Sequence, residues 1–470
     1  MDLPQFASLT DKESPIYLQL YWRFRNAIAT GKLAPGDRVP SIRSLASELN
    51  IARGTVGTAY QMLSSEGYLL ARGPAGTVVS PQLHRRIDVK TPVGATVLHR
   101  PSQVKTSGGF IPLQLGLPAL DAFPRKTWVR LAGRNLRAMS VPDMVNPDPN
   151  GHEPLRRAIA AYLAVSRGIA CTPDQVFITA GYRGALELIR RTLLQHGDTG
   201  WFEDPGYLYA RQFLEDAGMR LVPLPVDDNG LNVAAGLRHA SDAKFAVVTP
   251  THQSPSGVAL SLPRRLALLE WAETQRAWIV EDDYDSEFRY DGRPLPPLKS
   301  LDHGGRVLYA GTFSKVLYPG LRLAYLVVPE QEIGKFRSSM AQLGSSPLVF
   351  QATVADFMEQ GHFARHIKKM RSLYAVRRDY LIRALAQVFG GLLQVPDRAG
   401  GIHVLAYLQR KYNDKALAAA ANANGLAVMA LSEWHIRLRS PVGLLMGFAN
   451  IATPEQALKQ VQLLREALDH

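Results

Sequence analysis

The sequence predicts a multidomain α/β protein, with a small unit of three helices and a β-hairpin followed by a large unit on a mainly parallel sheet. Residues 15–80 show short helical periods and then a Gly/Pro-rich hairpin pattern. From residue 155 onward, helical stretches alternate with short apolar β-rich runs, which is typical of a buried parallel sheet; examples are residues 176–179, 245–249, 278–281, 307–310 and 324–328. We therefore divide the chain into residues 1–80, a linker at 81–110, and residues 111–470.

The composition is that of an ordinary soluble protein. The 470 residues are 46% hydrophobic and 20% charged, which suffices for a large buried core. No apolar run approaches membrane-spanning length and none follows a basic N-terminus, so we expect a cytoplasmic protein with no membrane partner. The lone Cys171 cannot form an intrachain disulfide. A net charge of +13 favours a polyanionic partner, although residues 1–80 hold only eight basic and six acidic residues.

The first element of the small unit is an amphipathic helix. Ile16, Leu20, Phe24 and Ile28 recur every four positions, which places them on one helical face, and Pro15 is suited to the helix start. A glycine and a Pro-Gly pair at positions 31–36 end the helix.

The next two helices form a helix-turn-helix. Ser41 can cap a short helix with Leu45 on its apolar face, and a tight turn leads to a third helix with Val56 and Leu63 inward. Beyond Gly67 the alternating pattern of residues 68–79 around a Gly/Pro tip predicts a two-stranded wing.

The outward face of this unit carries groups suited to double-stranded DNA. At the start of the third helix, Arg53, Thr55 and Thr58 offer short or forked donors for base edges and phosphates in a major groove. Arg43 is placed to clamp the DNA backbone, and Gly76 at the wing tip completes the predicted contacts. The linker that follows is rich in Pro, Gly and basic residues, and we interpret it as a flexible or extended solvated spacer.

In the large unit, polar clusters follow the predicted strands. Ligands of parallel α/β sheets bind at the carboxyl ends of the strands, so we expect these clusters to meet. The clusters are residues 180–184, 249–257, 281–284 and 311–315.

These clusters supply the groups that pyridoxal 5′-phosphate (PLP) requires. Lys315 follows a buried strand, where desolvation can make it a nucleophile, and Asp282 is placed to keep the pyridine nitrogen protonated. Tyr284 can donate to the ring oxygen, and Tyr207 is a candidate ring cover. The expected phosphate donors are the backbone N–H groups of Gly181, Tyr182 and Arg183 at a helix start, with Thr312, Ser314 and Arg322. We expect no metal, because no His or Cys set with ligand spacing accompanies the acidic run.

The motifs resemble known families over nearly the full length. The stretches Pro15-Ile-Tyr-Leu-Gln-Leu, Arg53-Gly-Thr-Val and Glu66-Gly-Tyr resemble a GntR-type winged helix, while residues 110–465 resemble a fold-type-I aminotransferase. The whole chain is similar to the MocR subfamily of GntR regulators. This resemblance implies that Lys315 is the Schiff-base lysine, Asp282 the pyridine partner, Tyr284 the phenolate partner and Arg322 a phosphate ligand. It also implies a head-to-tail homodimer.

Departures from the family pattern bear on catalysis. Leu445 stands where family aminotransferases keep an arginine for the substrate carboxylate, Ser254 replaces an asparagine, and Asn146 replaces a tyrosine. Arg437 and Arg439 lie close in sequence and can substitute for the missing arginine. In the small unit, Gly57 stands where many relatives carry a DNA-contacting arginine.

The leading hypothesis is a dimeric transcription regulator whose aminotransferase-like domain senses PLP, or a PLP adduct with an amino compound, with vitamin B6 metabolism as the expected target. We expect a sensor rather than an enzyme, with at most a residual transaminase half-reaction. One alternative is an active aminotransferase with an accessory DNA-binding domain. Another is a DNA-binding repressor whose large domain serves only dimerisation.

Overall fold

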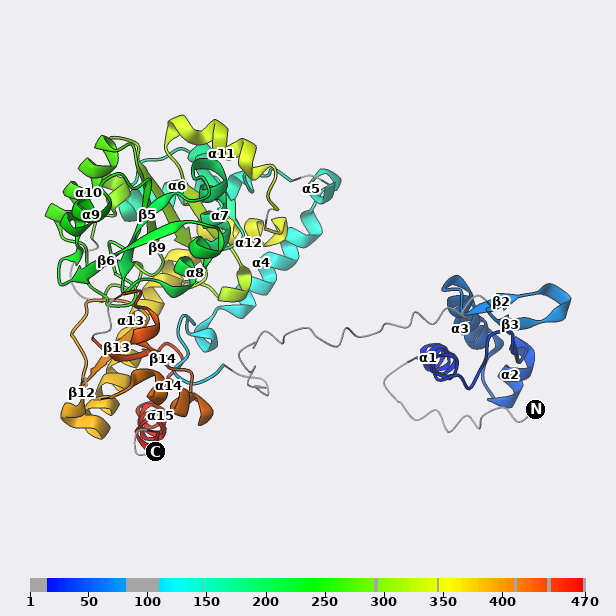
Figure 1. The fold of residues 1–470 in the computed structure, drawn as a ribbon. Coiled ribbons are helices and arrows are strands. Elements are labelled where there is room, and N and C mark those ends of the chain that lie inside the picture. The colour runs from blue at the N-terminus through cyan, green and yellow to red at the C-terminus, as the bar shows by residue number, and fades with distance from the viewer. Residues whose placement is uncertain are drawn as a thin grey trace. The chain divides into compact units, whose positions relative to one another are not determined.

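The computed structural model describes residues 15–81, 110–145, 147–290, 295–344, 346–409, 412–437 and 441–467. The chain separates into two compact units, Met1–Val104 and Lys105–His470 (Figure 1). The predicted linker lies outside the described residues except at its two ends. Asn146 and Arg439 also lie outside them.

The small unit is a three-helix fold with a three-stranded antiparallel sheet of order β1-β3-β2. Its elements are α1 (Ile16–Ala29), β1 (Arg38–Val39), α2 (Ile42–Glu48), α3 (Arg53–Ser65), β2 (Leu69–Ala71) and β3 (Thr77–Val79). Ser41 caps α2 by accepting a hydrogen bond from the Ser44 backbone N–H at 3.1 Å. The predicted helix-turn-helix and wing are confirmed, while β1 was not predicted because two residues show no period.

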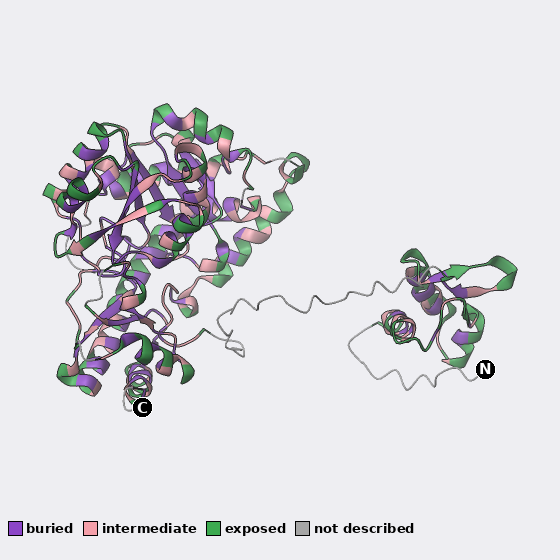
Figure 2. Cartoon of the chain, in the orientation of Figure 1, coloured by how far each residue is buried: buried purple, intermediate pink, exposed green. Residues whose placement is uncertain are grey.

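The apolar faces of the three helices meet in one core (Figure 2). Leu20, Leu45, Val56 and Leu63 are fully buried, and the rings of Phe24 and Tyr60 meet edge to face at 5.3 Å. Each of these side chains stabilises the unit by roughly 1.5–3 kcal/mol through burial.

An eight-stranded sheet of order β4-β11-β10-β9-β8-β5-β6-β7 forms the centre of the large unit. The strands are β4 (Val176–Thr179), β5 (Thr199–Asp204), β6 (Arg220–Asp227), β7 (Gly230–Leu231), β8 (Phe245–Val248), β9 (Trp278–Asp283), β10 (Val307–Thr312) and β11 (Ala324–Val327). Five neighbouring strands of this sheet, β6, β5, β8, β9 and β10, run parallel. Strands β7 and β11 pair antiparallel with their neighbours. The mainly parallel sheet is thus confirmed.

Helices cover both faces of this sheet. Alternate strand residues point to opposite faces, and in β8 Phe245 packs with α7, α8 and α11 whereas Ala246 packs with α9 and α10. On the second side Trp201 stacks on Trp271 with ring centroids 3.8 Å apart. The helices of this unit are α4 (Arg125–Ala138), α5 (Val141–Val145), α6 (Glu153–Arg167), α7 (Tyr182–Leu193), α8 (Leu208–Asp216), α9 (Val233–Ala240), α10 (Leu262–Thr274), α11 (Ile333–Met340), α12 (Leu348–Glu359), α13 (His362–Phe389), α14 (Asp414–Ala423) and α15 (Pro454–Glu466). None of the described helices is both long enough and apolar enough to cross a membrane.

A second, antiparallel sheet of order β12-β13-β15-β14 lies in the C-terminal part. Its strands are β12 (Leu393–Gln394), β13 (His403–Leu408), β14 (Met429–Ala430) and β15 (Gly443–Gly447). The start of the large unit binds alongside it, because the Gly447 N–H donates to the Leu113 carbonyl at 2.8 Å and the Ala427 N–H to the Pro112 carbonyl at 2.9 Å. The incoming chain is therefore fixed next to β15.

Candidate functional site

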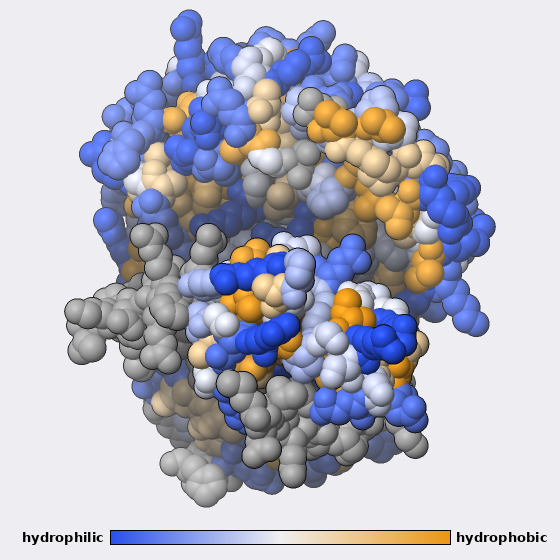
Figure 3. Space-filling model, turned by 90° about the vertical axis from the view of Figure 1, so that its right-hand side faces the viewer, coloured by the Kyte–Doolittle hydropathy of each residue, from blue (hydrophilic) through white to orange (hydrophobic). Residues whose placement is uncertain are grey.

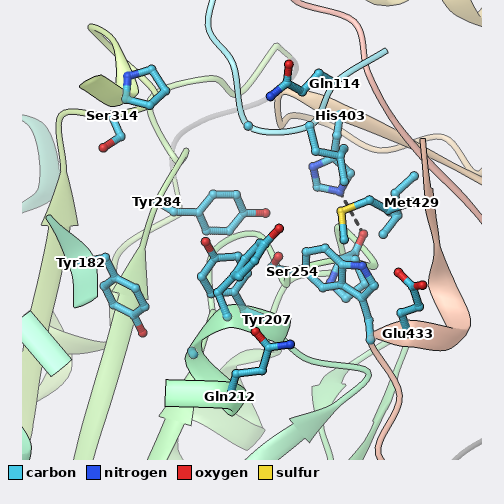
Figure 4. A pocket seen from close by; sticks show the side chains of 18 of the residues that line it. Gln114, Tyr182, Tyr207, Gln212, Ser254, Tyr284, Ser314, His403, Met429 and Glu433 are labelled. Carbon is cyan, nitrogen blue, oxygen red and sulfur yellow. Dashed lines mark hydrogen bonds between the residues drawn. The ribbon is translucent and has the colours of Figure 1, made fainter. Parts of the chain in front are cut away.

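A cavity of about 880 Å³ lies where the carboxyl ends of the parallel strands meet the C-terminal sheet (Figure 4). The parallel sheet brings together side chains from loops that are far apart in sequence. All ten residues that the sequence singled out for PLP line this cavity: Gly181, Tyr182, Arg183, Tyr207, Asp282, Tyr284, Thr312, Ser314, Lys315 and Arg322. Their individual roles remain predictions.

Lys315 lies just after β10 with its amine buried. Its Nζ donates to the carbonyl of Gly116 at 3.0 Å. Burial lowers the pKa of Lys315, and the carboxylates of Asp285 and Asp282 oppose this shift. A larger fraction of the amine is therefore neutral and nucleophilic than in an exposed lysine.

Gly116 is a site residue that the sequence analysis missed. Its φ is +76°, and a Cβ there would lie 2.5 Å from the Lys315 Nζ. Only glycine combines this backbone conformation with room for the amine. The sequence signal was a lone glycine in Leu115-Gly116-Leu117, which by itself predicts nothing so specific.

Asp282 lies near the end of β9 and is fully buried in the cavity wall. Burial raises the pKa of Asp282 well above its usual range; a hydrogen bond from Tyr182 opposes this shift, and neighbouring carboxylates including Asp283 and Glu203 add to it. Within the described part of the chain, no Lys, Arg or His side chain forms an ion pair with it. A cationic pyridinium at this point would supply the partner that the carboxylate lacks.

The phosphate end of the predicted site is the start of α7. Gly181, the residue before α7, already donates its N–H to the Thr179 carbonyl at 2.8 Å. Tyr182 and Arg183 belong to the first turn, where backbone N–H groups lack intrahelical partners. The guanidinium carbon of Arg322 would be 3.8 Å from a Cβ placed on Gly181, so this cation lies beside the helix start.

Two hydroxyls complete that end of the cavity, one from Thr312, the last residue of β10, and one from Ser314 in the loop that follows. The Thr312 hydroxyl accepts a hydrogen bond from the Ser314 backbone N–H at 3.1 Å, which fixes the turn between β10 and Lys315. A dianionic phosphate thus has a helix terminus, an arginine and hydroxyl groups within one small region.

Aromatic side chains form the middle of the cavity (Figure 4). Tyr207 lies at the start of α8 with ring centroids 6.2 Å from Tyr182 and 5.9 Å from Trp434. Ser254 and Tyr284 also line the cavity in this region (Figure 4). Burial raises the pKa of Tyr284 well above its usual range, so its hydroxyl keeps its hydrogen at neutral pH.

The opposite wall comes from the C-terminal sheet and is largely apolar. Leu445 is fully buried in a cluster with Leu208, Leu405, Leu431 and Trp434. Three residues of this wall, Met429, Glu433 and Trp434, were not singled out from the sequence.

The segment that carries this wall is anchored to the central sheet. Asp204 at the end of β5 accepts backbone N–H bonds from Ile436 and Arg437, each at 2.9 Å. The Arg437 side chain is exposed and is not among the residues lining the cavity.

Glu203, buried behind the cavity, predicts a pH dependence of stability. It accepts hydrogen bonds from the Thr249 hydroxyl at 2.6 Å and the Gln253 amide at 3.1 Å, and burial raises its pKa to about 7. The pKa of Glu203 is thus higher in the folded protein than in the unfolded chain. Protonated Glu203 therefore contributes its full stabilisation below the unfolded pKa, and this contribution is lost as the pH rises through 7. We expect E203Q to gain roughly 3 kcal/mol relative to wild type between pH 5 and pH 8.

Scanning calorimetry of the large-unit transition across this pH range measures the effect. E359Q, a change at an exposed glutamate of α12, serves as the control and should track wild type. A constant difference between E203Q and wild type would contradict the assignment.

In the small unit, the predicted DNA contacts lie around the start of α3. Arg53 is its first residue, and Arg43, Arg53 and Thr58 are exposed while Thr55 is half-buried. The Thr58 hydroxyl donates to the Gly54 carbonyl at 3.0 Å, which leaves it an acceptor toward other groups.

The side chain of Arg38, from β1, lies against the wing tip, a placement that the sequence analysis missed. Gly76 has a φ of +88°, and a Cβ there would be 2.8 Å from the Arg38 Nε. The bare backbone of Gly76 therefore allows the Arg38 side chain to lie against the wing.

Family models match both units. The model of the bacterial regulatory proteins of the gntR family matches residues 16–79, and that of aminotransferase class I and II matches residues 119–444. Among the described residues, no group of three or more His, Cys, Asp or Glu side chains is arranged to hold a metal ion.

Curated relatives match nearly the whole chain. The probable rhizopine catabolism regulatory protein MocR of Rhizobium meliloti is 36% identical over 470 residues, covering 97% of this chain and 94% of that protein. The HTH-type pyridoxine biosynthesis transcriptional regulator PdxR of Corynebacterium glutamicum is 34% identical over 450 residues, with 96% and 95% covered. Among solved structures, Pyrococcus horikoshii kynurenine aminotransferase in complex with PMP is 27% identical with a TM-score of 0.70, covering 77% of this chain and 91% of that one.

Proposed function

Because this chain belongs to the MocR-type family of GntR regulators, we propose that it is a transcription regulator whose small unit binds operator DNA under the control of PLP bound in the large unit. The observation that carries the proposal is the pairing of a GntR winged helix with a cavity that holds a buried lysine and a buried carboxylate without an ion-pair partner among the described residues.

The residues present fit PLP. Lys315 would hold the aldehyde carbon as a Schiff base, Asp282 the pyridine nitrogen, and Arg322 with the α7 start the phosphate. When bound, PLP supplies an aldehyde that condenses with an amine and a ring that withdraws electrons. Tyr284 would donate to the ring oxygen, and Tyr207 would cover the ring.

The apolar wall supports sensing over turnover. A substrate carboxylate would face the buried Leu445 instead of a guanidinium, which leaves its charge without a partner at that point. We infer that the effector is PLP itself or its adduct with an amino compound, and that any transaminase half-reaction is slow. Similarity to a regulator of pyridoxine biosynthesis favours vitamin B6 metabolism as the target.

The test is fluorescence anisotropy of labelled DNA from upstream of the protein's own gene and its neighbour, with and without PLP at fixed salt. Saturable, competitor-resistant binding that changes with PLP is the expected result. Specific binding that ignores PLP would remove PLP as the effector. Steady turnover of an amino-acid and keto-acid pair, without specific DNA binding, would favour the aminotransferase alternative.

We expect Arg53→Ala to weaken operator binding by roughly 10- to 100-fold, the range for losing one good contact to a base or phosphate. Arg43→Ala should reduce the affinity for all DNA sequences to a similar extent. It should also lower by about one the slope of the logarithm of the binding constant against the logarithm of the salt concentration. Arg238→Ala, at an exposed position of α9, is the matched control. Unchanged affinity of the Arg53 variant in a salt titration would exclude this residue from the interface.

We propose a head-to-tail homodimer that buries the exposed apolar side chains of α4 and α5. Val129, Leu136, Val141 and Met144 are 62–72% exposed, and hydrophobic surface is visible on the side of the large unit where α4 and α5 lie (Figure 3). Leu136→Glu combined with Val141→Glu should shift the sedimentation coefficient to that of a monomer. Leu237→Glu, in α9, should stay dimeric; a monomeric wild type would refute the proposal.

A further inference from the structure

His252 lies directly behind Tyr284, outside the cavity. Its Nδ1 is 3.0 Å from the Tyr284 hydroxyl oxygen and 3.1 Å from one carboxylate oxygen of Asp285. The Asp285 side chain is only 1% exposed. Tyr284 lines the cavity whereas His252 and Asp285 do not, so any effect of this pair on a bound molecule passes through the tyrosine.

The hydrogen-bond roles in this triad follow from the carboxylate. An ionised carboxylate only accepts, so the Nδ1 atom beside Asp285 must carry a hydrogen. A protonated Nδ1 can only donate, and the Tyr284 oxygen is therefore an acceptor toward it. The hydrogen of the Tyr284 hydroxyl is not used by His252 and is left for the cavity.

Packing fixes the imidazole ring in this orientation. A Cβ on Gly401 would lie 2.2 Å from the His252 Cε1, and one on Gly257 would lie 3.0 Å from Nε2. Both glycines have positive φ values, +93° and +72°, so two backbone segments close on the ring where side chains would exclude it.

Other charged and titratable groups around the triad do not compete for the Nδ1 hydrogen. His403 donates its Nε2 hydrogen to the Pro255 carbonyl at 3.0 Å, and burial, then His252, lowers its pKa. Arg398 donates to the Ser256 carbonyl at 3.0 Å. The other neighbours are Lys315 and Asp282 in the cavity wall, Glu203 behind it, Tyr290 near Asp285, and Ser254, whose side chain hydrogen-bonds the Tyr284 oxygen.

We propose that His252 is a positioning residue: paired with Asp285, it commits the Tyr284 hydroxyl to donate toward the ring oxygen of bound PLP. The proposal rests on PLP being the cofactor. A hydrogen bond donated to an anionic oxygen weakens that oxygen's hold on a nearby proton. The pair therefore lowers the pH midpoint at which the visible absorption of the PLP-loaded protein changes.

The experiment is a pH titration of the visible absorption of full-length, PLP-loaded protein. His252→Phe keeps a ring but removes the donor, and we expect its midpoint to rise by about one pH unit. His252→Asn places an amide N–H near the position of Nδ1 and should restore the wild-type midpoint. Asp285→Asn removes the charge that fixes the tautomer, and it should shift the midpoint in the same direction as His252→Phe.

A double-mutant cycle separates positioning from a general structural effect. In a Tyr284→Phe background, His252→Phe should add nothing, because its effect passes through the hydroxyl. The matched control is His435, a buried histidine whose Nδ1 lies 3.3 Å from the Asp204 Oδ1 and which does not contact Tyr284. His435→Asn should leave the midpoint unchanged.

An unchanged midpoint in both His252→Phe and Asp285→Asn, or additive shifts in the cycle, would overturn the proposal. Absence of any visible band in wild-type protein supplied with PLP is a different result, because it would instead refute PLP as the cofactor.

Discussion

Lys315→Ala should abolish the borohydride-trapped PLP adduct, from about one equivalent per chain to none, as detected by intact mass. The reason is positional, since the buried amine of Lys315 is held at 3.0 Å from the Gly116 carbonyl in the cavity that also holds Asp282. Two of the described lysines line this cavity, and burial lowers the pKa of Lys315, which favours its neutral, nucleophilic form.

The matched control is the second of these lysines, Lys415, which is exposed on α14. Lys415→Ala should trap PLP as wild type does. Full-stoichiometry trapping in the Lys315 variant would show that another amine carries the cofactor. Non-covalent PLP binding can survive in Lys315→Ala, because the phosphate end of the cavity is unaltered, so anisotropy with that variant also asks whether the covalent bond is needed for signalling.

Asp282→Asn should produce two opposite effects. Affinity for PLP should fall roughly 100-fold, since the variant removes one partner of a buried charge pair. The ligand-free variant should be more stable than ligand-free wild type at pH 8. Burial raises the pKa of the wild-type carboxyl, so at this pH the carboxyl lowers the stability of the folded state, either because it is ionised without a cation beside it or because it must take up a proton.

Equilibrium dialysis measures the first effect, and calorimetry of the ligand-free protein measures the second. Tyr182→Phe, a change at a neighbouring buried group, should lose less than tenfold in affinity, the scale of one neutral hydrogen bond. Equal affinities of wild type and Asp282→Asn would remove the carboxylate from contact with the ring nitrogen.

Local patterns in the sequence sufficed for much of the fold. The apolar β-rich runs at β4, β8, β9, β10 and β11 were all predicted, because each is short and apolar, and a polar cluster follows the first four of them. Strand β6 was missed since it contains Pro223 and Pro225, which ordinarily argue against a strand. In the parallel ladder both prolines lie beside β5, opposite Phe202 and Asp204.

The half of the site that comes from strand ends was predictable for the same reason. Lys315, Asp282 and Gly181 each stand at a position that a parallel sheet defines from sequence alone. Gly116, Met429 and Trp434 could not be predicted, because their place depends on long-range pairing within the C-terminal sheet and along the incoming chain. His252 belongs to the polar cluster at residues 249–257, but its pairing with Asp285 depends on how two loops fold together.

The attachment of the incoming chain beside β15 has a consequence for communication. Gln114, Leu115 and Gly116 line the cavity, and they lie only a few residues after Phe110 in the chain. A molecule that fills the cavity would therefore contact the first residues of the large unit, directly after the segment that joins the two units. A change of occupant would act on the chain next to that segment, without first having to rearrange the core of the domain.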